Sequence, residues 1–218
     1  MMNKLDYKKE FKDLYLPKTQ PMEIIVPKMN FIMVDGNGNP NDEDGEYKKA
    51  VELLYALSYT IKMSKDIKKE LDNYFDYVVP PLEGLWWLEN DDMDFSKKYK
   101  YIWTSMIRQP EFVTKEVFEL ACNEVKEKKP HIDISKARFE VFDEGLCVQC
   151  MHIGPFDNEK VTTEKIDKYI MENNLINDIS GINEDGKVRR HHEIYLSDPR
   201  RCNIERMKTV IRHPVRRK

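Results

Sequence analysis

The chain of 218 residues lacks any apolar run of the ~18 residues that a membrane-spanning helix needs. Its first segment, Met1–Lys18, is charged throughout and has no apolar stretch of the kind found in signal peptides. It holds only four cysteines, a number typical of proteins kept in a reducing compartment. Because 40% of its residues are hydrophobic and only 8 are glycine, disorder is not expected. The sequence therefore predicts a folded cytoplasmic protein with no membrane partner.

Signals for cofactors and metals are also scarce. The glycines of residues 35–41 match neither the G-x-G-x-x-G fingerprint nor the P-loop, so no nucleotide cofactor is expected. Cys147 and Cys150 form a C-x-x-C inside a strand-like run, where their side chains should point to opposite faces. No second C-x-x-C is present to complete a zinc site. We interpret both cysteines as core-filling residues, and we expect no metal and no cofactor.

An excess of positive charge is missing as well. The chain has 36 basic and 39 acidic residues and a formal net charge of −3, which gives no general affinity for nucleic acid. Residues 212–218 are basic, and they could be taken for a nucleic-acid patch. Since no aromatic residues are interleaved with them, the sequence favours a solvated tail.

Hydrophobic periodicity predicts an α+β fold made of two successive β-α-β-β modules. Strand-like segments are expected at residues 22–34, 74–88, 100–107, 139–142, 146–153, 191–196 and 206–212, and helices at 46–69, 114–129 and 158–173. Residues 1–20 are expected to form an N-terminal arm. The remaining domain, 21–218, would consist of two pseudo-repeats, about 21–110 and 139–218, joined by helix 114–129. Such modules would form curved antiparallel sheets with helices on one face and a ligand groove on the other.

The strand at residues 191–196 carries the most informative side chains. His191, Glu193 and Tyr195 should share one face, and Ile194 and Leu196 the opposite, core-facing one. Two interpretations of Glu193 remain open here, an exposed strand residue or an acid at the floor of a pocket. If Glu193 lies among aromatic side chains, burial should raise its pKa.

Aromatic residues on the other predicted strands favour the pocket. If Ile102 packs under the helices as Ile194 does, Tyr101 and Trp103 face the groove together with Glu193. One of Trp86 and Trp87 must face the same way, because adjacent strand residues alternate. Aromatic rings around a carboxylate suit a flat, lipophilic or cationic small molecule.

Seven stretches of the sequence resemble the GyrI-like small-molecule-binding domain family, in its stand-alone branch. They are YKKE at 7–10 with LY at 14–15, DGNGNPN at 35–41, PLEGLWW at 81–87, MIRQP at 106–110, HIGPF at 152–156, the block 191–201, and residues 208–215. One departure is Phe156, where the family often has Tyr, so no hydroxyl can be invoked at that position.

The resemblance implies a groove for lipophilic drugs, as in the effector-binding domains of multidrug-sensing regulators, with Glu193 at the position of their buried acid. Stand-alone members resemble hydrolases of cyclopropanoid electrophiles, which would make Glu193 a general base assisted by Tyr195. Trp86, Trp87 and Trp103 would form the slot, and His152 or His191 is a candidate donor. A non-catalytic drug-sequestering protein and a protein-interaction module remain alternatives, and the sequence leaves open whether the chain forms a homodimer. No helix-turn-helix segment is recognised in the sequence.

Overall fold

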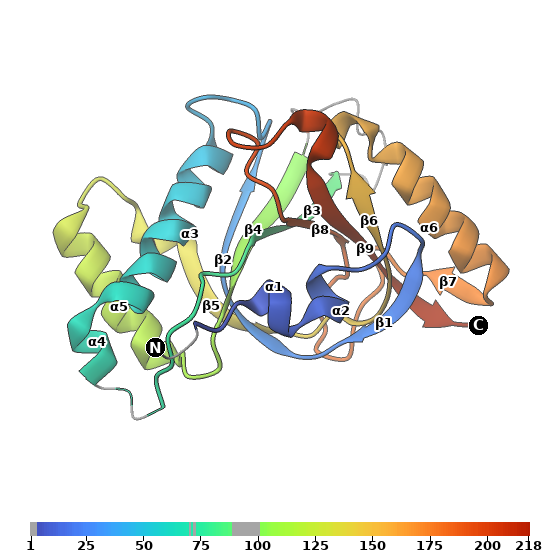
Figure 1. Cartoon of the computed structure of the whole chain (residues 1–218). Coiled ribbons are helices and arrows are strands. Elements are labelled where there is room, and N and C mark those ends of the chain that lie inside the picture. Colours follow the sequence, from blue (N-terminus) through green and yellow to red (C-terminus); the bar gives the residue numbers. More distant parts are fainter. Residues whose placement is uncertain (1–3, 70, 72, 89–100) are drawn as a thin grey trace. The chain divides into compact units, whose positions relative to one another are not determined.

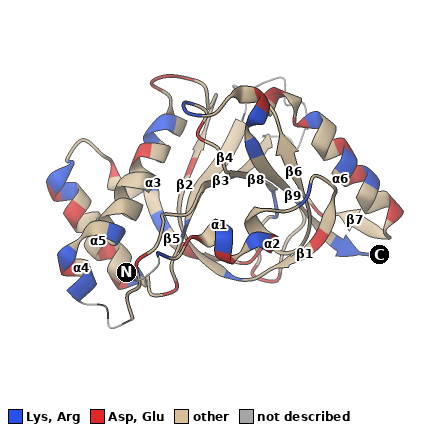
Figure 2. Cartoon of the chain, in the orientation of Figure 1, with Lys and Arg blue, Asp and Glu red and all other residues tan. Residues whose placement is uncertain are grey.

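The computed structural model describes residues 4–69, 71, 73–88 and 101–218, and these fall into two compact units (Figure 1). Unit 1 comprises the described parts of residues 1–7, 29–82 and 87–142, and unit 2 comprises residues 8–28, 83–86 and 143–218. Antiparallel strands and helices occur in both, which confirms the α+β class. Figure 2 shows charged residues gathered on α4, α5 and α6, whereas the strands are largely uncharged.

Unit 1 is built on three antiparallel strands in the order β4-β2-β5. Helix α3 packs against β2, β4 and α5 (Figure 1). The elements of this unit are β2 (Met29–Asn37), α3 (Glu46–Met63), α4 (Lys65–Lys69), β4 (Tyr101–Gln109), α5 (Lys115–Lys128), a 3-10 turn (Ile134–Lys136) and β5 (Ala137–Phe142). The apolar stripe predicted for the first helix is buried at Ala50, Leu54, Leu57 and Ile61.

The predicted helix 46–69 is interrupted at Ser64, which ends α3 and begins α4. Its backbone is extended (φ −62°, ψ 125°), while its N–H still donates to the Thr60 carbonyl at 2.8 Å. The Ser64 hydroxyl oxygen accepts from the Ile67 N–H at 3.3 Å, as serine does at a helix start. The next helix, α5, is capped by Thr114, whose side chain accepts from the Val117 N–H.

Unit 2 contains strands in the order β1-β6-β9-β8-β3, and β7 adds to β9. Of β3 (Leu82–Leu88), residues 83–86 belong to this unit. The other elements are α2 (Lys12–Tyr15), β1 (Met22–Val26), β6 (Gly145–Ile153), a 3-10 turn (Phe156–Asn158), α6 (Lys160–Glu172), β7 (Leu175–Asn177), β8 (His191–Tyr195), a 3-10 turn (Ile204–Arg206) and β9 (Lys208–Arg217). A four-residue helix, α1 (Tyr7–Glu10), precedes α2.

Strand alternation gives unit 2 two buried faces. Val148 of β6 and Ile211 of β9 pack with Ile166 of α6 in one core cluster. Residues of the opposite parity, Gln149 and Arg212, hydrogen-bond to each other and to the main chain of the α2 segment. Helical segments therefore cover both faces of these strands, although helices were predicted on one face alone.

The last strand is longer than predicted. β9 continues to Arg217, pairing with β6 as far as Pro214 and with β7 beyond it. Arg212, His213 and Val215 are buried, so the prediction of a solvated tail is wrong for this part of the segment. The basic residues were misleading because the Arg212 guanidinium is neutralised internally by Glu144, at 2.8 Å.

Candidate functional site

Unit 2 brings several predicted site residues together on the α6 side of β8. His191 Nε2 lies 3.1 Å from Glu193 Oε1, which confirms that these side chains share a strand face. Glu159, which directly precedes α6, joins them, because ligand-type atoms of Glu159, His191 and Glu193 all lie within 4.8 Å of one another. The predicted orientation of Glu193 away from the helices is wrong, since its face is the one that α6 covers.

The two carboxyl groups of this cluster titrate in opposite directions. Burial, together with the neighbouring charge of Glu193, raises the pKa of Glu159 well above its ordinary value. Burial alone would raise the pKa of Glu193 too, but the hydrogen bond and charge of His191 and hydrogen bonds with Tyr195 and Glu159 lower it. The predicted rise at Glu193 is therefore wrong. The two directions favour a charge on Glu193 and a proton on Glu159.

Either a proton or a cation could in principle hold such a cluster together. Glu159, His191 and Glu193 are the residues, among those the structure describes, whose atoms come close enough to surround one metal ion. A metal would require both carboxylates to be ionised. In the absence of a cation the raised pKa of Glu159 favours a proton on this carboxyl, whose Oε1 atom is buried and has no hydrogen-bond partner among the described residues. We therefore treat the cluster as a pair of carboxyl groups that share one proton.

Aromatic side chains border this pair. The Trp86 indole Nε1–H donates to the Tyr195 hydroxyl oxygen at 2.8 Å, so Trp86 faces the Glu193 side of the strands. Phe156 packs edge-on against Tyr195, with ring centroids 5.6 Å apart. Gly84 makes room for the indole, because a Cβ at that position would lie 2.7 Å from Trp86 Nε1. The strand 191–196 thus presents a carboxylate next to a fixed indole–phenol pair.

His152 lies on the same face, but its ring is engaged elsewhere. Nδ1 is 2.9 Å from the Thr162 hydroxyl of α6, and Nε2 is 3.1 Å from the Pro155 carbonyl. These contacts stabilise the turn that leads from β6 into α6. The described contacts therefore give His152 a structural role, and its role as a donor to a ligand stays a prediction.

Three other predicted site residues, Trp87, Tyr101 and Trp103, belong to unit 1. Trp103 is 1% exposed and packs edge-on against Tyr47 of α3, at 5.1 Å between ring centroids. Its predicted orientation away from the helices is wrong. The reason is Gly36, which pairs with Trp103 across β2 and β4 and leaves the space that the indole fills. That these three residues contact a ligand stays a prediction.

The opposite face of unit 2 holds a buried ionic network that the sequence analysis did not identify. His192 Nδ1 lies 2.9 Å from Glu144 and His192 Nε2 lies 3.1 Å from Glu83, while Arg212 pairs with the second oxygen of Glu144. Although burial opposes both charges, the pair stabilises them. The pKa of His192 is raised to about 9 and that of Glu144 is lowered to about 2. Since these groups are enclosed, we assign the network a structural role.

Sequence reasoning also missed Glu159 and His213. Glu159 precedes a helix, where an acidic residue is common on electrostatic grounds alone. His213 sits in the basic segment that was taken for a tail. Only the pairing of β9 with β6 and β8 buries it, 2.8 Å from His191. No local signal in the sequence distinguishes either residue.

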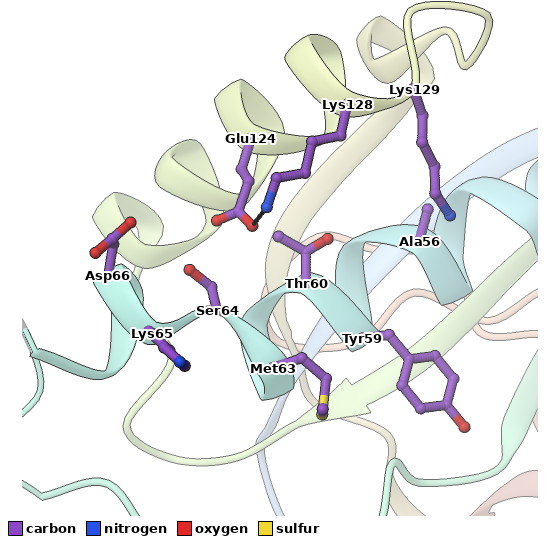
Figure 3. Close-up of a pocket in the computed structure, with 10 residues that line it drawn as sticks. All are labelled: Ala56, Tyr59, Thr60, Met63, Ser64, Lys65, Asp66, Glu124, Lys128 and Lys129. Atoms are coloured by element: carbon purple, nitrogen blue, oxygen red, sulfur yellow. Dashed lines mark hydrogen bonds and ion pairs between the residues drawn. The ribbon is translucent and has the colours of Figure 1, made fainter.

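A separate pocket of about 480 Å³ lies in unit 1, between α3–α4 and α5 (Figure 3). Its lining is largely polar, and the Lys128 ammonium pairs with Glu124 along α5. None of the residues predicted for the ligand site lines it. We assign this pocket no role.

Comparison with known proteins agrees with the fold. The chain belongs to the family of the GyrI-like small molecule binding domain, whose model matches residues 19–216. No curated protein matches the chain. None of the helices in the described residues is both long and apolar enough to span a membrane.

Solved structures include close relatives. An uncharacterized conserved protein from Listeria innocua is 50% identical, with a TM-score of 0.89, and the match covers 98% of this chain and 100% of that one. A protein described as a hydrolase from Listeria innocua is 49% identical, with a TM-score of 0.85 and the same coverage. The EcmrR C-terminal domain is 11% identical over 91% of this chain and 98% of that one, and its TM-score of 0.52 shows likeness of fold alone.

Proposed function

We propose that this chain binds flat lipophilic or cationic small molecules beside Glu193 and hydrolyses cyclopropanoid electrophiles, with Glu193 as the general base. The observation that carries the proposal is a close pair of carboxyl groups, Glu193 with a lowered pKa and Glu159 with a raised pKa, with Tyr195 and Trp86 alongside. Two relatives described as hydrolases, 49% and 48% identical, support it.

The two carboxyl groups supply both proton transfers that the reaction needs. Water attacks a carbon of the strained ring, and the carbon–carbon bond breaks with its electron pair passing into the adjoining dienone, which becomes an aromatic phenolate. Glu193 accepts the proton that the water loses. Glu159 holds the proton that the phenolate oxygen must gain, so atoms and charge balance with one water added. A proton passing from Glu193 back to Glu159 restores the starting state.

The aromatic side chains around Glu193 would recognise the substrate. Trp86 is fixed by its bond to Tyr195, and Phe156 is 39% exposed on the same side of the strands. Ring faces of this kind stack on flat aromatic compounds, and they also attract cations. Tyr195, which hydrogen-bonds to the Glu193 carboxylate, would orient it toward the water.

One observation favours a second candidate, a binder that sequesters lipophilic cations without catalysis. The lowered pKa of Glu193 makes it a permanent counter-ion at neutral pH and a weaker base than an unpaired buried carboxylate. In that case Glu159 would take no part in binding, and its carboxyl would be neutral because it is buried.

The substitution Glu193→Gln separates the two functions, because it keeps the shape and removes the charge. For the hydrolase, the variant should still bind a neutral cyclopropane-bearing dienone, measured by quenching of tryptophan fluorescence, and lose turnover by roughly 10²–10⁴-fold. For the sequestering protein, the variant should lose affinity for cationic dyes alone. Glu172→Gln, at an exposed site on α6, serves as the control.

Mass spectrometry gives the deciding measurement, the addition of one water to the intact compound. If the unaltered protein binds the dienone and yields no hydrated product, the hydrolase proposal is refuted.

A further inference from the structure

The Glu193–His191 pair is continued by a second histidine that the reaction above does not use. His213 of β9 is 1% exposed, and its Nε2 lies 2.8 Å from His191 Nδ1. Its other ring nitrogen, Nδ1, has no hydrogen-bond partner among the described residues and lies 3.9 Å from Asp167 Oδ1 on α6. Asp167 is half exposed. A line of side chains thus leads from Glu193 through two buried imidazoles to the outer surface of α6.

The geometry fixes where the protons sit on this line. A carboxylate facing His213 Nδ1 favours a proton on that nitrogen, which leaves Nε2 as an acceptor. His191 Nδ1 must then be the donor in the short contact between the rings. Its Nε2 donates in turn to Glu193 Oε1 at 3.1 Å, so in this arrangement His191 has a proton on both ring nitrogens and is an imidazolium between two acceptors. Burial, followed by the charge of His191, lowers the pKa of His213 well below its ordinary value, in agreement with a neutral ring.

We propose that His213 is a positioning residue, which accepts the His191 Nδ1 proton and thereby holds the other imidazole proton of His191 on Glu193. Through this contact the Glu193 carboxylate is kept ionised and turned toward Glu159. The role matters for catalysis only if Glu193 is the base, so in that respect the inference rests on the proposed function. The contact itself can be measured without any substrate.

Carboxyl groups approach the two rings from more than one element. Glu193 lies on the β8 side and Glu159 just ahead of α6, and Asp167 faces His213 from α6 itself. On β6 the same face carries Val148 and Cys150, and on β7 the Asn177 amide lies 3.5 Å from Asp167. Burial raises the pKa of Asp167. A change at His213 should therefore act first on His191 and, through it, on Glu193.

The test compares His213→Leu, which cannot accept a hydrogen bond, with His213→Gln, whose amide oxygen can. Carbon-13 NMR follows the Glu193 carboxyl, which is assigned by its loss in Glu193→Gln, and nitrogen-15 NMR reports whether one or both ring nitrogens of His191 carry a proton. His213→Leu removes the acceptor of the His191 Nδ1 proton and should leave His191 neutral. We therefore expect the pKa of Glu193 to rise by about 1 or more, the usual effect of losing one adjacent opposite charge. His213→Gln should restore most of the difference.

Substitutions on the surface of α6 keep the test decisive if the core variants do not fold. Asp167→Asn should move the His213 nitrogen signals and raise the pKa of Glu193 by a smaller amount, while Glu172→Gln on the same helix should change neither. An unaltered Glu193 titration in a folded His213→Leu, or unmoved His213 signals in Asp167→Asn, overturns the inference. If the expected titrations appear but no hydrated product forms, the hydrolase proposal fails and the positioning role stands.

Discussion

Replacing Glu144 with glutamine should destabilise the protein strongly, because this carboxylate is the centre of a fully enclosed ionic network. Its two oxygens accept hydrogen bonds from His192 at 2.9 Å and from Arg212 at 2.8 Å. The neutral amide introduced by Glu144→Gln would leave the Arg212 guanidinium and the His192 imidazolium short of negative charge where water cannot compensate. Breaking a buried ion pair by removing one partner costs about 3–5 kcal/mol.

The pKa of His192 gives an independent magnitude. Burial opposes the charged ring, but Glu144 and Glu83 together raise its pKa from 6.5 to about 9, which corresponds to about 3 kcal/mol of stability. Glu144 itself is lowered from 4.5 to about 2, a difference of similar size. The pKa changes of His192 and Glu144 arise largely from the contact between these two residues, so the two free energies are not added. Both agree with the lower end of the range expected for a broken pair.

The pH dependence follows from the direction of each change. Because the pKa of His192 is raised on folding, its contribution is complete below 6.5 and is lost as the pH rises through about 9. Because the pKa of Glu144 is lowered, its contribution is complete above 4.5 and is lost as the pH falls toward about 2. The difference in unfolding free energy between the unaltered protein and Glu144→Gln should be largest between these limits and shrink above pH 9.

Urea unfolding at a pH between 4.5 and 6.5, and again above 9, measures this difference. The control is Glu172→Gln, which removes an exposed pair with Lys168 and should cost no more than about 0.5 kcal/mol. If Glu144→Gln costs as little as the control, or if its cost is the same on both sides of pH 9, the assigned network is wrong.

Two further predictions concern the indole and the thiols. Gly84→Ala should displace the Trp86 ring, since a Cβ there would lie 2.7 Å from Nε1, and should cost about 1–3 kcal/mol in thermal unfolding with a shifted tryptophan emission. An unchanged spectrum and melting temperature would contradict this. A thiol reagent at neutral pH should modify Cys202 first, because burial raises the pKa of Cys122 to about 11 and also that of Cys147 and Cys150. Rapid labelling of Cys147, followed by peptide mapping, would speak against the assigned burial.

Much of the fold could be predicted because it depends on local patterns. The helices at 114–129 and 158–173 lie within two residues of α5 and α6, since the apolar spacing of both, and the Thr114 cap of α5, are encoded in the segment itself. The run 22–34 is instead two strands, β1 and β2, with Pro27 and Lys28 between them. β1 pairs with β6 of unit 2, whereas β2 pairs with β4 and β5 of unit 1. The hydrophobic periodicity of a segment does not indicate which distant strand it pairs with.

The site was predictable only in part, for the same reason. Alternation along 191–196 correctly places His191 and Glu193 on one face, because strand geometry is local. Which face the helix covers depends on pairing across the sheet, so Glu193 and Trp103 were oriented wrongly. The pKa of Glu193 was predicted in the wrong direction because its partner, His191, was treated as a separate donor to a ligand.

Two hydrogen bonds hold α2 against the strands of unit 2, and both are accepted by main-chain carbonyls of the N-terminal arm. Arg212 Nη2 donates to the Leu14 carbonyl at 2.9 Å, and Gln149 Nε2 donates to the Asp13 carbonyl at 2.5 Å. Every amino acid offers such a carbonyl, so the arm can change its residues without losing these bonds. The family model matches residues 19–216 and leaves both carbonyls outside the match. A chain shortened to the matched segment would leave a buried guanidinium without one of its acceptors, so the folding unit extends further toward the N-terminus than the segment that the family model matches.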